Sequence, residues 1–381
     1  MPPISVMIKP SSGMCNMICD YCFYCDETKK REQEIFGFMS EETLKNVIRR
    51  TMLNAEGSIS YAFQGGEPTL RGLGFLRKFV ELEKKYNKNQ LIVSNVFQTN
   101  GILLDDEWCS FFHDNHFLVG VSLDGTEETH NAHRRMKVAK DNSLETHSRV
   151  IRAIDLLKKH EVEFNILTVV NQTVAKNIQS VYEFYRRNGL GFQQYIACLD
   201  PLDEVRGQNA YAIHPVEYGH FLISLFELWY RDYKKNRQPY IRQFENYIGN
   251  LMGNYPEACD MRGSCSVQYV VEADGGVYPC DFYMLDEYRL GNFNSDKLTV
   301  IDQKREESRF VERSKKLPEE CMKCEYLRLC RGGCMRHREQ QTANGKYYNY
   351  YCTSFKMFFE ACLPAMREIV VNNSGKGRSY K

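Results

Sequence analysis

Neither an apolar run of about 18 residues nor a basic segment leading into an apolar stretch occurs in this sequence. The first absence argues against a membrane-spanning helix, and the second argues against a secretory leader. An excess of one charge is missing too, because 50 Lys and Arg residues oppose 49 Asp and Glu residues, for a net charge of +1. That balance gives no reason to expect a nucleic acid or a membrane surface as a partner. We therefore expect a soluble, cytoplasmic protein that binds neither.

The sequence does contain far more cysteine than an ordinary globular protein needs. Its 381 residues are 43% hydrophobic and 26% charged, which suits two or three folded domains and not a disordered chain. Fifteen of the residues are cysteines. Disulfides explain them poorly in a chain without a secretory leader, because the cytosol keeps thiols reduced. Binding of a metal or an iron–sulfur cluster is the better interpretation.

About the first 200 residues alternate strand-like and helix-like segments. Apolar residues near helical spacing predict helices over 40–53, 70–86 and 147–160. Ser40, followed by two glutamates, is a plausible start of the first helix. Runs rich in β-branched and aromatic residues predict six strands, at Ile4–Ile8, Ile59–Phe63, Leu91–Phe97, Phe117–Ser122, Phe164–Val170 and Phe192–Ala197. Strands that each lead into a helix form parallel βαβ units, in a barrel or a doubly wound sheet, with reactive side chains at the carboxyl ends of the strands.

Beyond about residue 200 the sequence changes character. A long helical pattern over 214–235 leads into a region of short strands, turns and most of the remaining cysteines. Within that region, residues 267–280 predict a hairpin closed around an Asp-Gly pair. We predict two domains, 1–235 and 236–381, the second ending in a C-terminal helix and a frayed polar tail.

Three cysteines follow the first predicted strand in a tight loop, as Cys15-x3-Cys19-x2-Cys22. Three thiolates can bind three irons of a four-iron cluster and leave the fourth iron open to a substrate or cofactor. A structural zinc site prefers four ligands, so this triplet leaves zinc one ligand short. Cys25 lies outside the spacing, and we interpret it as a bystander, although it forms a second C-x2-C pair with Cys22.

This cysteine spacing, with the aromatic pair Phe23 and Tyr24 beside it, resembles the signature of the radical S-adenosylmethionine (SAM) enzymes. The loop also stands where that family has it, after the first strand of a βα series. The resemblance implies an α/β fold, a partial (β/α)6 barrel of the TIM type. It also implies a [4Fe–4S] cluster on Cys15, Cys19 and Cys22, whose open iron is chelated by the amino and carboxylate groups of SAM.

A Gly-Gly-Glu-Pro sequence ends the second predicted strand, at Gly65, Gly66 and Glu67. Taken alone it is a turn, in which glycine lets the backbone approach a neighbour closely. In the radical SAM family this edge offers backbone acceptors to the methionyl ammonium group. The resemblance therefore implies that all three residues are cofactor neighbours.

Four further residues match positions that contact SAM in that family. Ser122 and Arg134 match contacts of the methionyl carboxylate, an anion that a hydroxyl and a guanidinium suit chemically. Tyr24 and Leu199 match contacts of the adenosine part. Without the resemblance, these positions are polar turns or core residues at strand ends.

Eight C-terminal cysteines are spaced like those of a SPASM domain, which holds two auxiliary [4Fe–4S] clusters in peptide-modifying radical enzymes. The resemblance implies interlaced ligands, the first cluster being bound by Cys259, Cys265, Cys280 and Cys334. The second would be bound by Cys321, Cys324, Cys330 and Cys352, for three [4Fe–4S] clusters in total. A pair of zinc ribbons is the alternative that spacing alone leaves open. We expect the unassigned thiols to be buried and free: Cys25, Cys109, Cys198 and Cys362.

Along nearly the full chain the match extends to the anaerobic sulfatase-maturating enzymes. It rests on "MPPISVMIKP" before the cysteine loop, on "YAFQGGEPT", on "CLDPL" and on "VYPCDFYMLDEYRLGN". Such enzymes oxidise one cysteine or serine of a sulfatase to Cα-formylglycine. The resemblance therefore implies a sulfatase segment of the Cys-x-Pro-x-Arg type as substrate, and an external one-electron reductant such as flavodoxin or ferredoxin.

The implied reaction starts when a 5′-deoxyadenosyl radical, formed from SAM at the first cluster, takes a hydrogen atom from the substrate β-carbon. The substrate must then lose its thiol proton and one more electron, and the resulting thioaldehyde hydrolyses. Asp281 directly follows Cys280 and corresponds to the proposed proton acceptor of the family. Free Asp and Cys have pKa values of about 3.9 and 8.5, so direct transfer costs about 6 kcal/mol unless burial or the adjacent radical offsets it. Without the resemblance, Asp281 is a surface carboxylate beside a cluster.

Two other functions stay open at this point. A related maturase would form thioether or carbon–carbon links in a different peptide, and an electron carrier would do no bond chemistry. The peptide-binding residues are undefined as well. Gln64, Tyr195 and Arg242 are plausible by their location.

Overall fold

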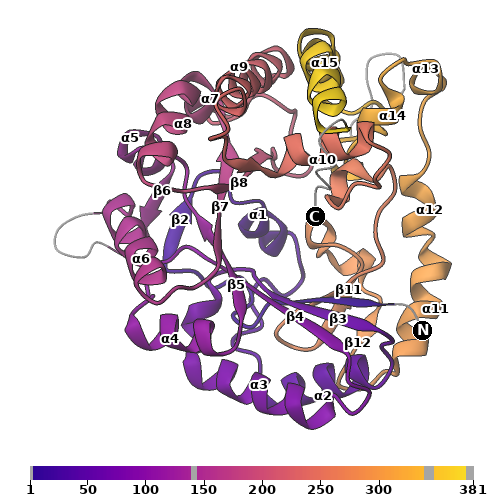
Figure 1. Cartoon of the computed structure of the whole chain (residues 1–381). Coiled ribbons are helices and arrows are strands. Elements are labelled where there is room, and N and C mark those ends of the chain that lie inside the picture. The colour runs from indigo at the N-terminus through magenta and orange to yellow at the C-terminus, as the bar shows by residue number, and fades with distance from the viewer. Residues whose placement is uncertain (1–2, 139–143, 339–346, 375–381) are drawn as a thin grey trace.

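The computed structural model describes residues 3–138, 144–338 and 347–374 of the chain. Within this part, one curved sheet of ten strands has the order β12-β11-β10-β1-β3-β4-β5-β7-β8-β9 (Figure 1). Neighbouring strands are parallel from β10 to β9, whereas β11 and β12 continue the β10 end in antiparallel fashion. The α/β fold with parallel strands that the sequence predicts is therefore present.

The six predicted strands are all found, within two residues of their predicted bounds. Along β3 every second residue is buried, so that Ile59, Tyr61 and Phe63 share one face of the sheet. A second, two-stranded antiparallel sheet of β2 (Met17–Cys19) and β6 (Arg134–Met136) was not predicted. Seven of the ten strands of the large sheet are β1 (Ile4–Ile8), β3 (Ser58–Phe63), β4 (Ile92–Thr99), β5 (Phe117–Ser122), β7 (Phe164–Val170), β8 (Phe192–Ala197) and β9 (Tyr240–Ile241).

A layer of amphipathic helices covers the outer face of the curved sheet (Figure 1). The Ser40 hydroxyl accepts a hydrogen bond of 3.0 Å from the Thr43 N–H, which confirms the predicted helix start. The helix predicted over 70–86 begins later, because residues 68–71 form a short 3-10 turn instead. The helices of this layer are α2 (Glu41–Met52), α3 (Leu73–Tyr86), α4 (Asp106–Asp114), α6 (His147–Lys159) and α8 (Ile178–Arg187).

Aromatic side chains fill the space between the sheet and the first helices of this layer. Phe63, Phe79, Phe97, Phe112 and Phe117 are all fully or almost fully buried. Their rings touch edge to face or tilted, with centroids 4.8 Å apart for Phe63 and Phe79 and 5.6 Å apart for Phe112 and Phe117. This core holds β3, β4 and β5 in place, and the carboxyl ends of these strands border the candidate site.

The predicted hairpin consists of β10 (Tyr269–Val271) and β11 (Gly276–Tyr278), to which β12 (Gly291–Asn292) is added. β10 pairs with β1 in parallel, with Val6 opposite Tyr269. The cysteine-rich region therefore extends the barrel sheet directly. The domain boundary near residue 235 stays a prediction, and the sheet runs across it.

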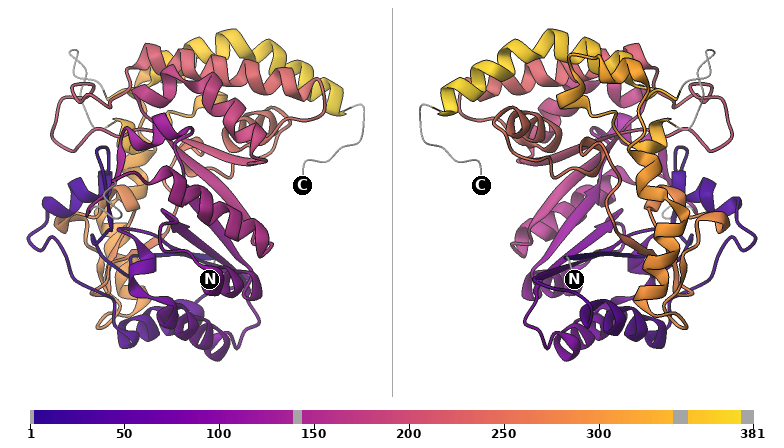
Figure 2. Two further views of the ribbon diagram at one scale, coloured as in Figure 1. Left: turned by 90° about the vertical axis from the view of Figure 1, so that its left-hand side faces the viewer. Right: turned by 90° about the vertical axis from the view of Figure 1, so that its right-hand side faces the viewer.

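Two long helices close one end of the molecule. α9 (Pro215–Tyr233) and α15 (Cys352–Ser374) lie side by side, as both views of Figure 2 show. α10 (Arg242–Leu251) packs against α15 through Phe244 and Phe358, whose ring centroids are 5.9 Å apart. These helices confirm the pattern over 214–235 and the predicted C-terminal helix. The predicted frayed tail lies mostly outside the described residues.

None of the helices in the described part of the chain is both long and apolar enough to cross a membrane. Shorter helices complete the described chain. They are α1 (Phe23–Lys29), α5 (Glu127–Asn131), α7 (Gln172–Lys176), α11 (Leu298–Ser308), α12 (Phe310–Ser314), α13 (Glu319–Met322) and α14 (Leu327–Cys330), with 3-10 turns at Pro68–Arg71, Cys259–Met261, Asp281–Tyr283, Asp286–Tyr288 and Met335–Arg338.

Candidate active site

Polar residues gather at the edge where the parallel strands end. Lys9, Gln64 and Asn100 directly follow β1, β3 and β4. Ser122 is the last residue of β5, and Leu199 follows β8. Because parallel strands end at one edge, residues that are distant in the sequence meet there, as expected for an α/β enzyme.

Cys15, Cys19 and Cys22 lie together beyond the end of β1. The pKa values of Cys15 and Cys19 are raised to about 12, chiefly by burial, and the neighbouring thiols of the triplet contribute to the rise. Cys15 and Cys19 are partly buried and Cys22 is exposed. Three neighbouring thiols that repel one another once ionised need a cation between them, and the iron core of a cluster is such a cation. The triplet therefore fits the predicted cluster.

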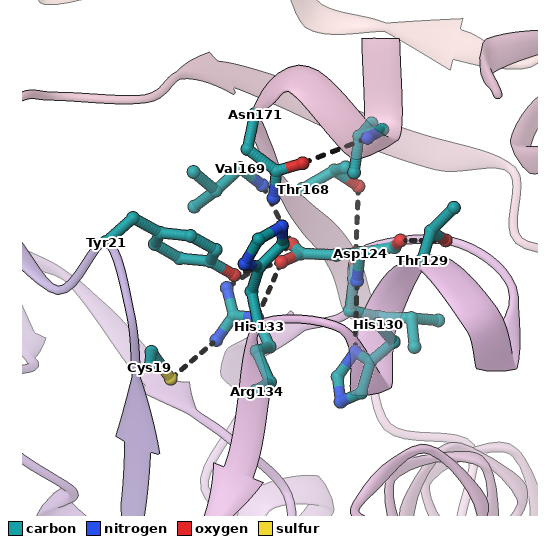
Figure 3. Close-up of polar contacts among 12 residues, drawn as sticks. Cys19, Tyr21, Asp124, Thr129, His130, His133, Arg134, Thr168, Val169 and Asn171 are labelled. Atoms are coloured by element: carbon teal, nitrogen blue, oxygen red, sulfur yellow. Dashed lines mark hydrogen bonds and ion pairs between the residues drawn. The ribbon is translucent and has the colours of Figure 1, made fainter. Parts of the chain in front are cut away.

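Hydrogen-bond donors point at the sulfur atoms of this triplet. The Met17 N–H lies 3.4 Å from the Cys15 Sγ, and the Asn100 amide lies 3.9 Å from it. The Arg134 guanidinium lies 4.0 Å from the Cys19 Sγ (Figure 3). Donors of this kind stabilise thiolate ligands and tune the cluster that they hold.

The prediction of a buried thiol is wrong for Cys25, which is exposed. On α1 the residues Tyr24, Glu27 and Thr28 face the interior. Since successive residues of a helix are turned by about 100°, Cys25 points away from that face. Cys109, Cys198 and Cys362 are buried free thiols, as predicted.

The side chain of Glu67 is buried and saturated with hydrogen bonds. Its Oε1 accepts from the Thr69 N–H, the Thr69 hydroxyl and the Thr99 hydroxyl, at 3.0, 2.7 and 2.8 Å. Its Oε2 accepts from the Asn100 N–H at 2.8 Å. This carboxylate ties the ends of β3 and β4 together, so that only the backbone of Glu67 is left to face a cofactor.

Gly65 and Gly66 adopt positive φ angles of 90° and 51°, which favour glycine. A Cβ on Gly65 would overlap the Lys9 Cδ, and one on Gly66 would lie 2.6 Å from the Ser12 carbonyl oxygen. The sequence led us to expect close approach of a ligand here. The structure adds that the protein itself already requires both glycines.

Arg134 is held by a buried ion pair with Asp124 (Figure 3). Its Nε lies 2.9 Å from Asp124 Oδ2 and its Nη2 lies 3.4 Å from Oδ1. The Tyr21 hydroxyl and the Val169 N–H, the latter at 2.9 Å, donate to the same carboxylate. Sequence analysis missed Asp124, although it stands only two residues after Ser122, the last residue of β5.

Tyr24 is buried beside β10 and connects the N-terminal part of the chain with the cysteine-rich C-terminal part. Its hydroxyl donates to Glu272 Oε2 at 2.6 Å, and Arg31 forms an ion pair with the same carboxylate at 2.6 Å. The Lys9 ammonium lies 4.3 Å from the centroid of the Tyr24 ring. The ring therefore borders the same corner of the site as Lys9.

A cavity of about 870 Å³ opens inside the curved sheet. Leu199 lines it, and so do the plausible peptide-binding residues Gln64, Tyr195 and Arg242. Asp281 lines it too, which places the predicted proton acceptor in reach of a bound molecule. Pockets of this size commonly hold small molecules or peptide segments.

The eight C-terminal cysteines form two groups. One group lines the large cavity: Cys259, Cys265, Cys280 and Cys334. The other lines a smaller cavity: Cys321, Cys324, Cys330 and Cys352, of which Cys330 also borders the large cavity. Apart from the shared position of Cys330, these groups have the members of the interlaced ligand sets that the resemblance implies, and the ligand sets themselves stay a prediction. Among the described residues no group of three or more His, Cys, Asp or Glu side chains is close enough to hold a single metal ion.

Asp281 has two partners at the wall of the large cavity. Its Oδ1 forms a buried ion pair with the Lys9 ammonium, and its Oδ2 accepts a hydrogen bond of 3.1 Å from the Gln64 amide. Sequence analysis missed Lys9. A lysine that directly follows the apolar strand Ile4–Ile8 was the signal that could have revealed it.

Two family models match the chain. The radical SAM superfamily matches residues 10–184, and an iron–sulfur cluster-binding domain, SPASM, matches residues 259–325. A cysteine-type anaerobic sulfatase-maturating enzyme of Clostridium perfringens is 42% identical, over 98% of this chain and 100% of the relative. The chain belongs to the anaerobic sulfatase-maturating enzymes. A serine-type member from Bacteroides thetaiotaomicron is 32% identical over 96% of this chain and 90% of its own length.

Solved structures agree with this family. "Native anSMEcpe with bound AdoMet and Cp18Cys peptide" has a TM-score of 0.91 and 42% identity, over 97% of this chain and 99% of that one. Streptococcus suis SuiB, at 16% identity and a TM-score of 0.62, covers 92% of this chain and 77% of its own and shares the fold. The predicted fold, a partial radical SAM barrel with a SPASM region, is confirmed.

Membership in the family has two further consequences. It makes the protein a radical SAM enzyme with iron–sulfur and SAM cofactors, as predicted, and so rules out a passive electron carrier. The match of residues 259–325 to an iron–sulfur domain also argues against the zinc ribbons left open by cysteine spacing.

Proposed function

We propose that this enzyme oxidises a specific cysteine of a sulfatase to Cα-formylglycine, and so activates the sulfatase under anaerobic conditions. The observation that carries the proposal is the one cavity that Asp281 shares with Gln64 and the thiol of Cys280. The Asp281 carboxylate at this position can reach the side chain of a peptide that enters the barrel. The 42% identity to a cysteine-type enzyme favours cysteine as the target, and serine is the second substrate to test.

Three [4Fe–4S] clusters serve this reaction in our proposal. Cys15, Cys19 and Cys22 bind the cluster that leaves one iron open to SAM. The two C-terminal groups of thiols bind the auxiliary clusters, Cys259, Cys265, Cys280 and Cys334 holding one, and Cys321, Cys324, Cys330 and Cys352 holding the other. Seven of the eight thiols line only one of the two cavities. Cys330 borders both, and it lies close enough to Cys352, Cys321 and Cys324 that, after burial, their charges raise its pKa, which supports this assignment.

The proposed SAM contacts surround the N-terminal triplet. The backbone of Gly65, Gly66 and Glu67 faces the ammonium group, and Arg134 with Ser122 faces the carboxylate. Support comes from Asp124, which holds the Arg134 guanidinium close to the thiol of Cys19. Tyr24 and Leu199 would contact the adenosine, and Leu199 lines the cavity as that role requires.

Bound together, the first cluster and SAM supply the agent that removes a hydrogen atom from the substrate β-carbon. The protein then acts through Asp281, whose carboxylate accepts the proton of the substrate thiol. The Gln64 amide donates a hydrogen bond to that carboxylate at the cavity wall. Cys280, the neighbour of Asp281, is a cluster ligand in this proposal, so the base lies beside a redox centre.

We further propose a cytoplasmic location and an external one-electron reductant such as flavodoxin or ferredoxin. None of the fifteen cysteines, all of which lie in the described residues, forms a disulfide bond, as expected where thiols stay reduced. The substrate segment is a sulfatase peptide of the Cys-x-Pro-x-Arg type. Residues 1–235 would bind SAM, and residues 236–381 would carry the auxiliary clusters.

Mass spectrometry tests the proposal. Reduced, anaerobic enzyme is incubated with SAM and a Cys-x-Pro-x-Arg peptide, with matched peptides that carry serine or alanine in place of the cysteine. Replacement of sulfur by oxygen with loss of two hydrogens supports formylglycine formation. Loss of two hydrogens with sulfur retained would instead identify a maturase that forms crosslinks, and the alanine peptide should stay unchanged.

A further inference from the structure

The buried ion pair between Lys9 and Asp281 has no role in the reaction as described so far. We infer that Lys9 is a positioning residue, which fixes the Asp281 carboxylate for removal of the substrate thiol proton, and that Glu27, a second buried carboxyl nearby, takes no part in this step. The inference rests on the proposed function. It decides which of two acids acts as the base and what holds that acid in place.

Lys9 is restrained on several sides. Its side chain is fully buried, and its ammonium group lies between Asp281 and the face of the Tyr24 ring, 4.3 Å from the ring centroid. Its backbone N–H donates to the Val271 carbonyl oxygen at 2.8 Å, which ties the end of β1 to β10. Because the Lys9 side chain is restrained in this way, its ammonium group stays at one position beside Asp281.

The path of the Lys9 side chain depends on Gly65. A Cβ at Gly65 would overlap the Lys9 Cδ and would lie 3.0 Å from both the Cε and the Nζ. Gly65 also has a φ of 90°, which other residues rarely adopt. The Gly-Gly turn therefore leaves room for this lysine, whatever else it does for a cofactor.

Two carboxyls compete for the role of base in this corner. Glu27 is 1% exposed, and neither of its oxygens has a hydrogen-bond partner within the described part of the chain. Burial and then the charge of Asp281 raise the pKa of Glu27 to about 8, against the opposing effect of Lys9, Arg336 and Arg31. Glu27 therefore keeps its proton near neutral pH, whereas Asp281 has the direct ion pair.

The two contacts of Asp281 define the orientation of its carboxylate. Lys9 holds Oδ1 and Gln64 holds Oδ2, at the wall of the cavity. In the step itself, the S–H bond of the substrate breaks and an O–H bond forms on Asp281, while Lys9 keeps its protons. The electron would leave to the iron–sulfur cluster proposed on Cys259, Cys265, Cys280 and Cys334, whose ligand Cys280 is adjacent to Asp281 in the chain. Without Lys9 the carboxylate would lose one of its two contacts, so proton removal should slow while hydrogen-atom removal continues.

The test compares Lys9→Met with Lys9→Arg and with the matched control Glu27→Gln. Formylglycine, 5′-deoxyadenosine and the peptide KM are measured on anaerobic enzyme, together with iron content and Tm. For Lys9→Met we expect kcat for formylglycine to fall by about 30-fold or more, while KM and the rate of 5′-deoxyadenosine formation change by about threefold or less. Lys9→Arg should recover part of the loss, and Glu27→Gln should stay within about twofold of the wild type.

A wild-type ratio of 5′-deoxyadenosine to formylglycine in Lys9→Met would overturn the inference, and so would an equal loss in Glu27→Gln. If Lys9→Met fails to bind its clusters, Lys9→Gln, which keeps a hydrogen-bond donor without the charge, provides the same comparison. Failure of the proposed function looks different, because then the wild type makes no formylglycine from any cysteine peptide.

Discussion

Asp124 and Asp281 are two buried aspartates that each face a cation, yet their surroundings differ. Asp124 has no exposed surface, and its carboxylate accepts hydrogen bonds from Arg134, Tyr21 and Val169 (Figure 3). Asp281 has a side chain that is 10% exposed, lines the cavity, and contacts only Lys9 and Gln64 among the interactions that the structure records for its carboxylate.

This difference separates a structural carboxylate from a reactive one. A carboxylate has about four lone-pair positions, and Asp124 uses them on the protein. It cannot accept a substrate proton without losing one of these bonds. Asp281 keeps an open side toward the cavity, which a general base needs. The fully buried pair of Asp124 and Arg134 therefore fixes the Arg134 guanidinium, whereas the pair of Asp281 and Lys9 leaves one side of the Asp281 carboxylate accessible to substrate.

Asp124→Ala should have the largest effect, and the quantity that it lowers is the free energy of unfolding. It leaves the buried guanidinium of Arg134 without a counter-ion, which costs about 3–5 kcal/mol. Denaturant unfolding under anaerobic conditions measures this loss. The matched control is Asp20→Ala, which removes the more exposed contacts of Asp20 with Arg135 and His133 and should cost about 1 kcal/mol or less. Equal losses of unfolding free energy in the two variants would contradict the interpretation that the ion pair of Asp124 and Arg134 is fully buried.

Asp281→Asn should have the largest effect on catalysis. The amide keeps the shape of the side chain but cannot accept the thiol proton, so formylglycine formation should fall by about 100-fold or more. Iron analysis should still find about twelve irons per chain, four for each cluster. Full activity of this variant would remove Asp281 from the mechanism.

Glu27→Gln should change how stability depends on pH. The folded-state pKa of Glu27 is about 8, above its ordinary value of 4.5. Between these pH values the unfolded chain releases a proton that the folded protein keeps, so Glu27 lowers stability as the pH rises through this window. Unfolding measured at pH 5 and at pH 8 should show the wild type losing about 3–4 kcal/mol of unfolding free energy relative to the variant. A constant difference would mean that Glu27 ionises in the folded protein.

Tyr21→Phe should have the smallest effect. It removes one donor from Asp124, while Arg134 and Val169 remain bound to the carboxylate. The loss of one hydrogen bond from a saturated group costs about 1 kcal/mol. A thermal unfolding scan can detect it, and a cost as large as that of Asp124→Ala would show that the hydroxyl, not the ion pair, holds this site together.

Much of the fold could be predicted because its signals are local. The strand Phe117–Ser122 and the helix start at Ser40 each depend on a few adjacent residues, and the structure has both. The family resemblance likewise implied that Cys280 lies near Cys334, and the structure brings these two thiols together. The burial of Cys25 was wrong, because the direction of its side chain depends on which face of α1 packs inward.

The rest of the site could not be predicted, because it depends on long-range contacts. Lys9 and Asp281 are 272 positions apart, and the pairing of β1 with β10 brings their segments together. Asp124 was not predicted, because its role depends on Tyr21 and Arg134, which come from other parts of the chain. Glu27 was not predicted either, because its burial depends on how the chain packs around it.

By itself the sequence determined where the thiols stand along the chain, and with them the cluster chemistry, because the ligands of a cluster come in short, regular spacings. Only the tertiary structure decided which acid faces the cavity and which cation holds it. The physical reason is that an ion pair between distant segments leaves no periodicity or spacing in the chain, and it exists only once the sheet has closed around it.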